Sequence, residues 1–170
     1  MDVYDAIRTI VAVRKYQDKP VPEELIRRIV EAARLTASSR NLQPWHFIVV
    51  QDREMLRRLG ALAATGPYTA DAALAVVVAY EKDSPFGVSD ASLAIHSMML
   101  TAWAEGVGSN WVGFANRFDA VKPLLDVPDD LDILAIVPLG YPVVALGKGK
   151  KKRKALSEVA HQERFGRPFE

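Results

Sequence analysis

One long helix, expected between Ser89 and Glu105, constrains the fold of this chain more than any other feature. Ser89 or Asp90 is expected to cap its start, and Gly106 to end it. Ten of the fourteen residues from Ala91 to Ala104 are apolar, and they cover nearly the whole circumference of a helix. A helix that is hydrophobic on all sides is buried on all sides. In a chain of 170 residues, this pattern favours a dimer in which a second chain covers one side of the helix.

The rest of the chain predicts further helices and short strands. Apolar residues at helical spacing, with Pro22 in a first turn and Asp52 as a cap, indicate helices at residues 2–13, 22–36, 52–64 and 120–125. Continuous apolar runs indicate strands at residues 45–50, 74–80, 109–114 and 133–141. Two helices precede the first strand, so a simple doubly wound sheet is not expected. The class is α/β or α+β, with helices over a mixed sheet.

Composition excludes several classes of protein. The absence of cysteine excludes disulfides, thiolate catalysis and iron–sulfur clusters. The longest apolar stretch, Ala72 to Tyr80, has nine residues, less than half of the ~20 that a membrane helix needs. The segment Met1–Asp5 is acidic where a signal peptide is basic. We therefore expect one domain over residues 1–170, located in the cytoplasm and without a membrane partner.

Positive charge concentrates in a basic C-terminal tail, about residues 148–170. Six of the seven positions from Lys148 to Lys154 are Lys or Arg. Without these six, 16 basic residues stand against 21 acidic ones, which is unlike a globally basic nucleic-acid-binding protein. No aromatic residue interleaves with the run to stack on bases, so no nucleic-acid partner is expected. The run either faces solvent or, together with Arg14 and Lys15, surrounds a phosphate dianion.

The sequence contains no constellation of side chains for hydrolytic or metal chemistry. It has no Gly-x-Ser-x-Gly elbow and no Walker loop. The stretch Gly106-Val107-Gly108 lacks the third glycine of a dinucleotide fingerprint, because Trp111 stands at that position. His46, His96 and His161 lack metal-ligand spacing, and His96 is expected to be a satisfied core histidine. No general acid or base and no metal site are therefore expected.

A polar loop over residues 36–45 joins an expected helix to an expected strand. Its short side chains offer hydrogen-bond donors and acceptors at Ser38, Ser39, Asn41 and Gln43. Two interpretations stay open. The loop suits a polar ring system or a polyol, and it equally suits a helix C-terminal turn with local side-chain to backbone hydrogen bonds.

Three stretches together resemble the nitroreductase family, in order and at family spacing. The first contains Ala6-Ile7-Arg8-Thr9, Val13-Arg14-Lys15-Tyr16, Pro20-Val21-Pro22-Glu23 and Asn41-Leu42-Gln43-Pro44-Trp45. The second is Gly106-Val107-Gly108-Ser109-Asn110-Trp111-Val112-Gly113. The third is Pro138-Leu139-Gly140-Tyr141-Pro142, followed by Lys151-Lys152-Arg153. The resemblance spans essentially the whole chain.

This resemblance implies an α+β fold, an α/β-type sandwich whose mixed, mainly antiparallel sheet is covered by helices. It implies a homodimer with two molecules of FMN at the subunit interface. The phosphate would be held by Arg14, Lys151 and Arg153. The flavin of the partner subunit would be reached by Ser38, Ser39 and Asn41, with Gln43 in the same cofactor-binding set. Trp111 to Gly113 would line the ring, and the substrate pocket would be walled by Phe114, Arg117 and Phe118.

The chain departs from the family pattern at Ile10-Val11-Ala12, where the family usually carries Arg-Arg-Ser. The first Arg and the Ser of that pattern contact the phosphate and the flavin. A charged hydrogen bond is worth about 1.5–3 kcal/mol, so this departure predicts weaker FMN binding or an altered cofactor site. Lys15, Lys148 and Lys150 are the candidates for compensation.

The function implied is hydride transfer from NAD(P)H through FMN to a nitroaromatic, a quinone or a similar small organic acceptor. The flavin carries this chemistry, and the protein supplies orientation and charge tuning. The alternatives are a flavin-binding protein with little or no turnover and a different flavin chemistry on the same scaffold. The sequence names neither the physiological acceptor nor the choice between NADH and NADPH.

Overall fold

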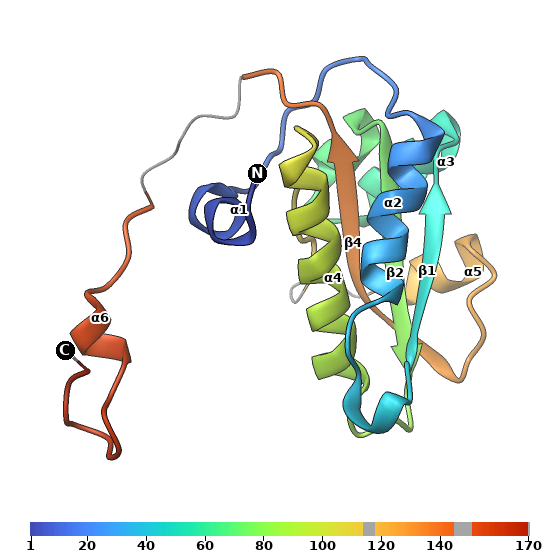
Figure 1. Cartoon of the computed structure of the whole chain (residues 1–170). Coiled ribbons are helices and arrows are strands. Elements are labelled where there is room, and N and C mark those ends of the chain that lie inside the picture. Colours follow the sequence, from blue (N-terminus) through green and yellow to red (C-terminus); the bar gives the residue numbers. More distant parts are fainter. Residues whose placement is uncertain (114–117, 145–150, 170) are drawn as a thin grey trace.

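The structure, a computed structural model, describes residues 1–113, 118–144 and 151–169. Four strands form one sheet whose neighbours all pair antiparallel, in the spatial order β1-β2-β4-β3 (Figure 1). The strands are β1 (Trp45–Val50), β2 (Leu74–Glu81), β3 (Gly108–Ser109) and β4 (Leu131–Gly140). A parallel bridge between Ala12 and Ser109 makes the pairing mixed. The α+β class, with a mainly antiparallel sheet under helices, is therefore confirmed.

The apolar run of β2 is explained by burial on both of its faces. Alternate residues of a strand point to opposite sides of the sheet. Leu74, Val76 and Val78 belong to one hydrophobic cluster, and Ala75 and Val77 to another. Because helices cover both sides, neither side of this central strand requires polar residues.

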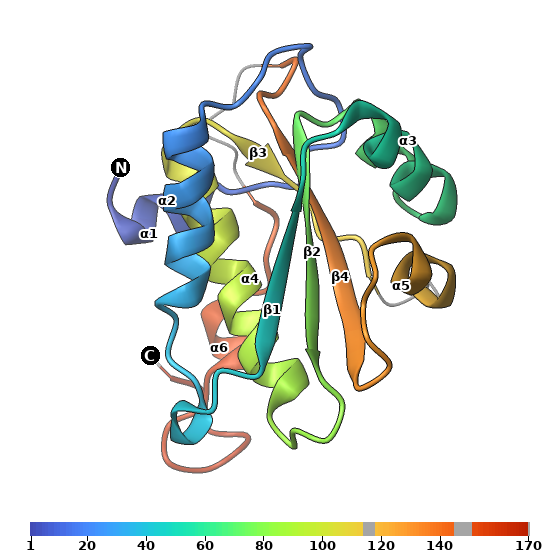
Figure 2. The same ribbon diagram turned by 90° about the vertical axis from the view of Figure 1, so that its right-hand side faces the viewer.

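Two layers of helices enclose the sheet (Figure 2). On one face lie α2 (Glu23–Arg34) and α4 (Gly87–Ala104), which also pack against each other. On the other face lie α3 (Arg53–Leu62), the 3₁₀ turn η2 (Pro67–Asp71), the turn η3 (Phe118–Ala120) and α5 (Val121–Leu124).

The first helix is shorter than expected. Helix α1 spans Val3–Thr9, with Asp2 as its N-cap, whereas the apolar spacing predicts a helix to residue 13. The backbone N–H of Val13 instead donates 2.9 Å to the carbonyl oxygen of Ser109. Residues 10–16 are therefore taken out of the helix by pairing with the sheet edge. The strand expected at 109–114 is correspondingly shorter, with β3 ending at Ser109 and one further bridge between Val112 and Ile136.

Helix α4 begins earlier than expected and is not covered on every side by its own chain. It starts at Gly87 after Phe86, so neither Ser89 nor Asp90 is its cap. Its buried side faces the sheet and α2, but Leu93 on the opposite side is 54% exposed. His96 lies on that exposed side, so its assignment as a core histidine is wrong within one chain.

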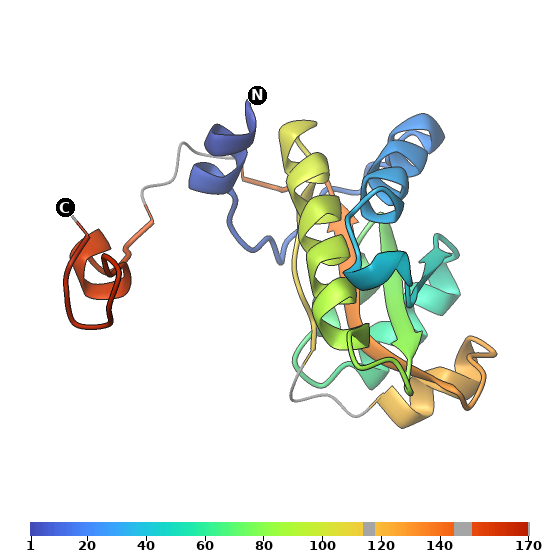
Figure 3. The same ribbon diagram turned by 60° about the horizontal axis from the view of Figure 1, so that its bottom comes forward.

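The C-terminal segment lies apart from the sheet. It contains α6 (Leu156–Val159) and a turn closed by the bridge between His161 and Pro168 (Figures 1 and 3). Several of its apolar side chains face solvent, and Phe165 is 93% exposed. The segment therefore adds little to the core of its own chain.

Candidate functional site

An extended segment around Arg14 runs along the edge strand β3. Ala12 bridges Ser109, and Val13 packs so closely on Gly108 that a Cβ there would lie 2.5 Å from Val13 Cγ2. Gly108 is needed for this close approach, because real Cβ contacts are essentially never below 3.0 Å. Val13 is buried while Arg14 and the residue after it are exposed. The pairing therefore holds the cationic side chains at the surface beside the sheet edge.

Tyr16 fixes the other end of this segment. Its buried hydroxyl donates 2.8 Å to the carbonyl oxygen of Val13 and 3.3 Å to that of Pro138. Burial raises the pKa of Tyr16 far above its usual value, so the hydroxyl stays a neutral donor. Gly140 makes room for the ring, since a Cβ at that position would lie 2.9 Å from it. Arg14 is thus held between two buried anchors, Val13 and Tyr16.

One cation of the C-terminal tail contacts the first helix. The ammonium group of Lys151 donates 2.6 Å to the carbonyl oxygen of Ile7, in the last turn of α1. Burial and the nearby charge of Arg153 lower the pKa of Lys151. Arg153 donates 3.0 Å to the neighbouring carbonyl oxygen of Lys152. Burial first, and then the charge of Arg153, therefore disfavour the charged form of the lysine.

Arg14 also shares a cavity of about 530 Å³ with cations that the sequence did not indicate. These are Arg53 and Arg57 at the start of α3, and Lys15, Asp18 and Asp71 complete the charged lining. Arg53 is held in place because it donates to the carbonyl oxygens of Ala72, at 2.6 Å, and Ala70, at 3.3 Å. In the sequence, both arginines look like the solvent face of an amphipathic helix.

The polar loop has an unusual backbone. The turn η1 (Ser39–Asn41) lies within it, and Arg40, Asn41 and Gln43 have φ values of 54°, 57° and 51°. Left-handed conformations cost non-glycine residues about 1–2 kcal/mol each. Such strain persists where the surroundings hold it, often at functional sites.

Local hydrogen bonds and one distant carboxylate hold this loop. The N–H of Gln43 donates 3.0 Å to the Ser38 hydroxyl, and the Gln43 side chain donates 3.2 Å to the Asn41 carbonyl. Ser39 donates from its backbone N–H and its hydroxyl to Asp90, at 2.9 and 3.2 Å. Both open interpretations therefore keep support, because local turn bonds exist while the Asn41 and Gln43 side chains remain exposed.

A single chain does not bring the loop and the cations together. Ser39 contacts Asp90 in the first turn of α4, whereas the last turn is tied to α1 by a 2.9 Å hydrogen bond from Trp103 to Thr9. With 18 residues, α4 is about 27 Å long, and the two groups lie at its opposite ends (Figure 1).

The ring-lining residues follow β3 directly. Trp111 is half-buried, and a Cβ at Gly113 would collide with its indole nitrogen, so the indole lies over that glycine. Phe118, expected in a pocket wall, is 8% exposed and packs in the core between α3 and α5. Its ring therefore packs in the core of its own chain. Phe114, Arg117, Lys148 and Lys150 lie outside the described residues.

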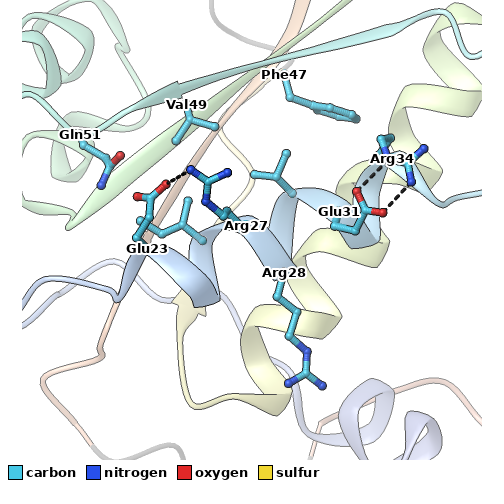
Figure 4. Close-up of a pocket in the computed structure, with 10 residues that line it drawn as sticks. Glu23, Arg27, Arg28, Glu31, Arg34, Phe47, Val49 and Gln51 are labelled. Atoms are coloured by element: carbon cyan, nitrogen blue, oxygen red, sulfur yellow. Dashed lines mark hydrogen bonds and ion pairs between the residues drawn. The ribbon is translucent and has the colours of Figure 1, made fainter.

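A groove on the other side of α2 is separate from the residues above. It encloses about 660 Å³ between α2 and β1, over an apolar floor that includes Phe47 and Val49 (Figure 4). Its charged rim is paired within the chain, between Glu23 and Arg27 at 3.3 Å and between Glu31 and Arg34 at 2.6 Å. Among the described residues, none of the sequence-predicted site residues lines it.

Within its described ranges, the chain offers neither a metal-binding cluster nor a membrane span. Among these residues, no group of three or more His, Asp or Glu side chains is placed to hold a metal ion. No helix there is long and apolar enough to cross a membrane.

Comparisons with known proteins agree on one class. The family model described as "Nitroreductase family" matches residues 7–84 and 66–141. A relative from Methanothermobacter thermautotrophicus, named "Putative NADH dehydrogenase/NAD(P)H nitroreductase", is 39% identical over 149 residues, which cover 84% of this chain and 78% of the relative.

Solved structures show the same likeness. A Bacteroides thetaiotaomicron protein of that name superposes with a TM-score of 0.88 at 26% identity, covering 96% of this chain and 98% of the other. An "FMN-dependent Nitroreductase" from Clostridium difficile gives 0.85 at 28% identity, covering 95% and 99%.

The sheet between its two helical layers, together with these structural matches, is that of the nitroreductase fold. The chain belongs to the nitroreductase family, and it is an oxidoreductase.

Proposed function

We propose that this chain is an FMN-dependent oxidoreductase that takes hydride from NAD(P)H and reduces a nitroaromatic, a quinone or a similar organic acceptor. Two copies form the working unit, with one FMN at each of two sites between them. A cytoplasmic location, where NAD(P)H is available, is part of the same proposal. One observation carries it. Lys151 reaches the last turn of α1 through its hydrogen bond to Ile7, with Arg153 two positions further on, and a phosphate dianion bound there would be favoured by both positive charges.

The residues present fit the phosphate end of FMN. Lys151 keeps ammonium protons beyond the one that it gives to Ile7, and Arg153 offers a planar fork of donors. Arg14 is exposed and held beside β3 by its buried neighbours. These three side chains would bind the phosphate and set the direction in which the cofactor enters the site.

The ring end of FMN fits a site made from two copies. The loop with Ser38, Asn41 and Gln43 lies at the far end of α4 from Arg14 and Lys151, farther than one flavin reaches. A second copy supplies the missing loop to each site. The uncovered side of α4 around Leu93 and His96 gives the copies a partly apolar surface to share.

Bound FMN would supply hydride acceptance and donation at its N5 position. The chain itself supplies binding and orientation. Trp111, lying over Gly113, would wall one side of the ring, and the partner's loop would contact its polar edge. Phe114, Arg117 and Phe118 stay predicted as acceptor-pocket residues.

A flavin-binding protein with little turnover is the second candidate. It is favoured by the segment Ile10-Val11-Ala12, in which Ile10 packs on an apolar cluster and Val11 is exposed. Neither side chain offers a donor to a phosphate. Weak binding at this site would leave part of the protein without cofactor.

The first test is the colour of the purified protein. It is expected to be yellow, or to become yellow on titration with FMN, and to release FMN and not FAD when denatured. Partial occupancy that fills on titration supports the weakened phosphate site. Protein that stays colourless in excess FMN contradicts the proposed function.

A further inference from the structure

Asp90 places a buried carboxylate against the polar loop, and its surroundings are unlike those of a surface acid. Asp90 is 2% exposed, in the first turn of α4. Burying a carboxylate is costly unless hydrogen bonds and favourable charge compensate. Here the positive end of the α4 dipole faces the carboxylate, and Ser39 gives it two hydrogen bonds. No cation forms an ion pair with Asp90 within the described part of the chain.

These two hydrogen bonds hold the loop at the residue immediately before its strained positions. Ser39 precedes Arg40 and Asn41, and both of these have positive φ. Helix α4 is rigidly packed in the core, whereas the loop has few buried side chains of its own. The hydrogen bonds between Ser39 and Asp90 therefore fix the loop relative to α4. Without them, the strained backbone of the loop is free to relax.

The same contacts give Ser38 and Ser39 roles within the loop itself. The Ser39 hydroxyl and N–H are both occupied by Asp90, and the Ser38 hydroxyl accepts the N–H of Gln43. The side chains of Asn41 and Gln43 remain on the outside of the loop. Ser39 thus serves as the attachment point, and Asn41 and Gln43 are the groups presented outward.

We propose that Asp90 is a positioning residue: it clamps Ser39 so that the strained loop presents Asn41 and Gln43 to the flavin of the partner subunit. This role rests on the proposed function. Asp90 does not touch the flavin itself. It acts through the conformation of the loop. Replacing Asp90 leaves the side chains of Asn41 and Gln43 chemically unchanged and alters only how they are held.

The experiment compares full-length variants by two readouts. FMN dissociation constants come from fluorescence titration. Trypsin cleavage after Arg40, identified by mass, reports the loop in the apoprotein, and cleavage after Arg58 in α3 reports global unfolding. Asp90→Ala is expected to weaken FMN binding about tenfold or more, the scale of one or two lost hydrogen bonds. It is also expected to accelerate cleavage after Arg40 and not after Arg58.

Two milder variants and one control complete the design. Asp90→Asn keeps an acceptor for the Ser39 N–H, and Ser39→Ala keeps that N–H, so both are expected to fall between wild type and Asp90→Ala. They decide the question if Asp90→Ala does not fold. Glu24→Ala removes an exposed first-turn acid from α2, away from the loop, and is expected to match wild type in both readouts.

The possible failures are distinguishable. Wild-type protein that binds no FMN contradicts the proposed function, and this role with it. If wild type binds FMN and the Asp90 and Ser39 variants bind it within about twofold of wild type, the role of Asp90 alone is overturned. Faster cleavage after Arg40 with unchanged FMN affinity also overturns it, because loop position would then not govern flavin binding.

Discussion

The ammonium group of Lys151 donates a 2.6 Å hydrogen bond to the carbonyl oxygen of Ile7, 144 positions earlier in the chain. The acceptor lies in the last turn of α1, where carbonyl groups lack helical partners and a positive charge is favourable. This contact brings the basic tail to the N-terminal segment that carries Arg14. It is the structural basis for the proposed phosphate site and for the first prediction.

FMN affinity is expected to fall as the pH rises toward the alkaline range. A phosphate dianion binds the ammonium form of Lys151 and raises its pKa in the complex. Affinity is therefore highest below the pKa of the free protein and declines above it. Because burial and Arg153 lower that pKa, the decline begins earlier than for an ordinary lysine. Titrations between about pH 7 and 9.5 test this.

Lys151→Arg is the matched variant for the pH prediction. Arginine stays charged throughout this range, so its FMN affinity is expected to stay flat where that of wild type declines. An equal decline in both proteins would show that a group other than Lys151 titrates.

Individual cations are expected to contribute unequally to FMN binding. Arg14→Ala and Arg153→Ala are each expected to weaken binding by about 1.5–3 kcal/mol, the value of one charged hydrogen bond. Lys154→Ala, just past the family motif, is expected to change it far less. Calorimetric titration of the three variants measures this. Equal losses of FMN affinity in all three variants would show that the cluster acts only as a diffuse positive field, without individual binding roles.

Leu93→Asp is expected to separate the proposed dimer without unfolding the chain. Leu93 is 54% exposed in one chain, so an aspartate there stays hydrated in the monomer. In a dimer it would be buried without a partner, at a cost of several kcal/mol. Light scattering is expected to give twice 18.8 kDa for wild type and a monomer for the variant.

Leu62→Asp provides the control for that experiment. Leu62 is 37% exposed, but it lies on α3, on the other face of the sheet. This variant is expected to remain a dimer. A wild-type monomer that still binds FMN would contradict the two-copy site.

Mixing two defective variants is expected to restore one complete site. In a heterodimer of Asp90→Ala and Arg14→Ala chains, one site receives both lesions and the other receives neither. We expect one FMN per heterodimer, bound with wild-type affinity. If the loop served the flavin of its own chain, each site would carry one lesion, and no tight site would appear.

Strand and helix types were readable from the sequence where local pattern decides them. The strand at Trp45–Val50 is confirmed to the residue. The apolar run of β2 predicts burial on both faces, which the two helical layers provide. For residues 10–13 the sequence predicts a helix, because their apolar residues have helical spacing, and that prediction is wrong. The hydrogen bonds of this segment go to Ser109, a partner that no local pattern reveals.

The site was less readable, because its geometry depends on distant contacts. Asp90 has the sequence signature of a helix cap, yet it is buried and holds Ser39. His96 has apolar neighbours in sequence but lies on the uncovered side of α4. Arg53 and Arg57 line the same cavity as Arg14, and Arg53 is held there by the distant carbonyl oxygens of Ala70 and Ala72.

Anaerobic stopped-flow absorbance of the FMN-loaded protein tests the central claim most directly. NADH or NADPH is expected to bleach the oxidised flavin, and a nitroaromatic or quinone added afterwards is expected to restore its colour. One site serving two substrates in turn also predicts ping-pong kinetics, with parallel double-reciprocal lines. Fully loaded protein that neither nucleotide bleaches would contradict the oxidoreductase proposed here and leave a flavin-binding protein without turnover.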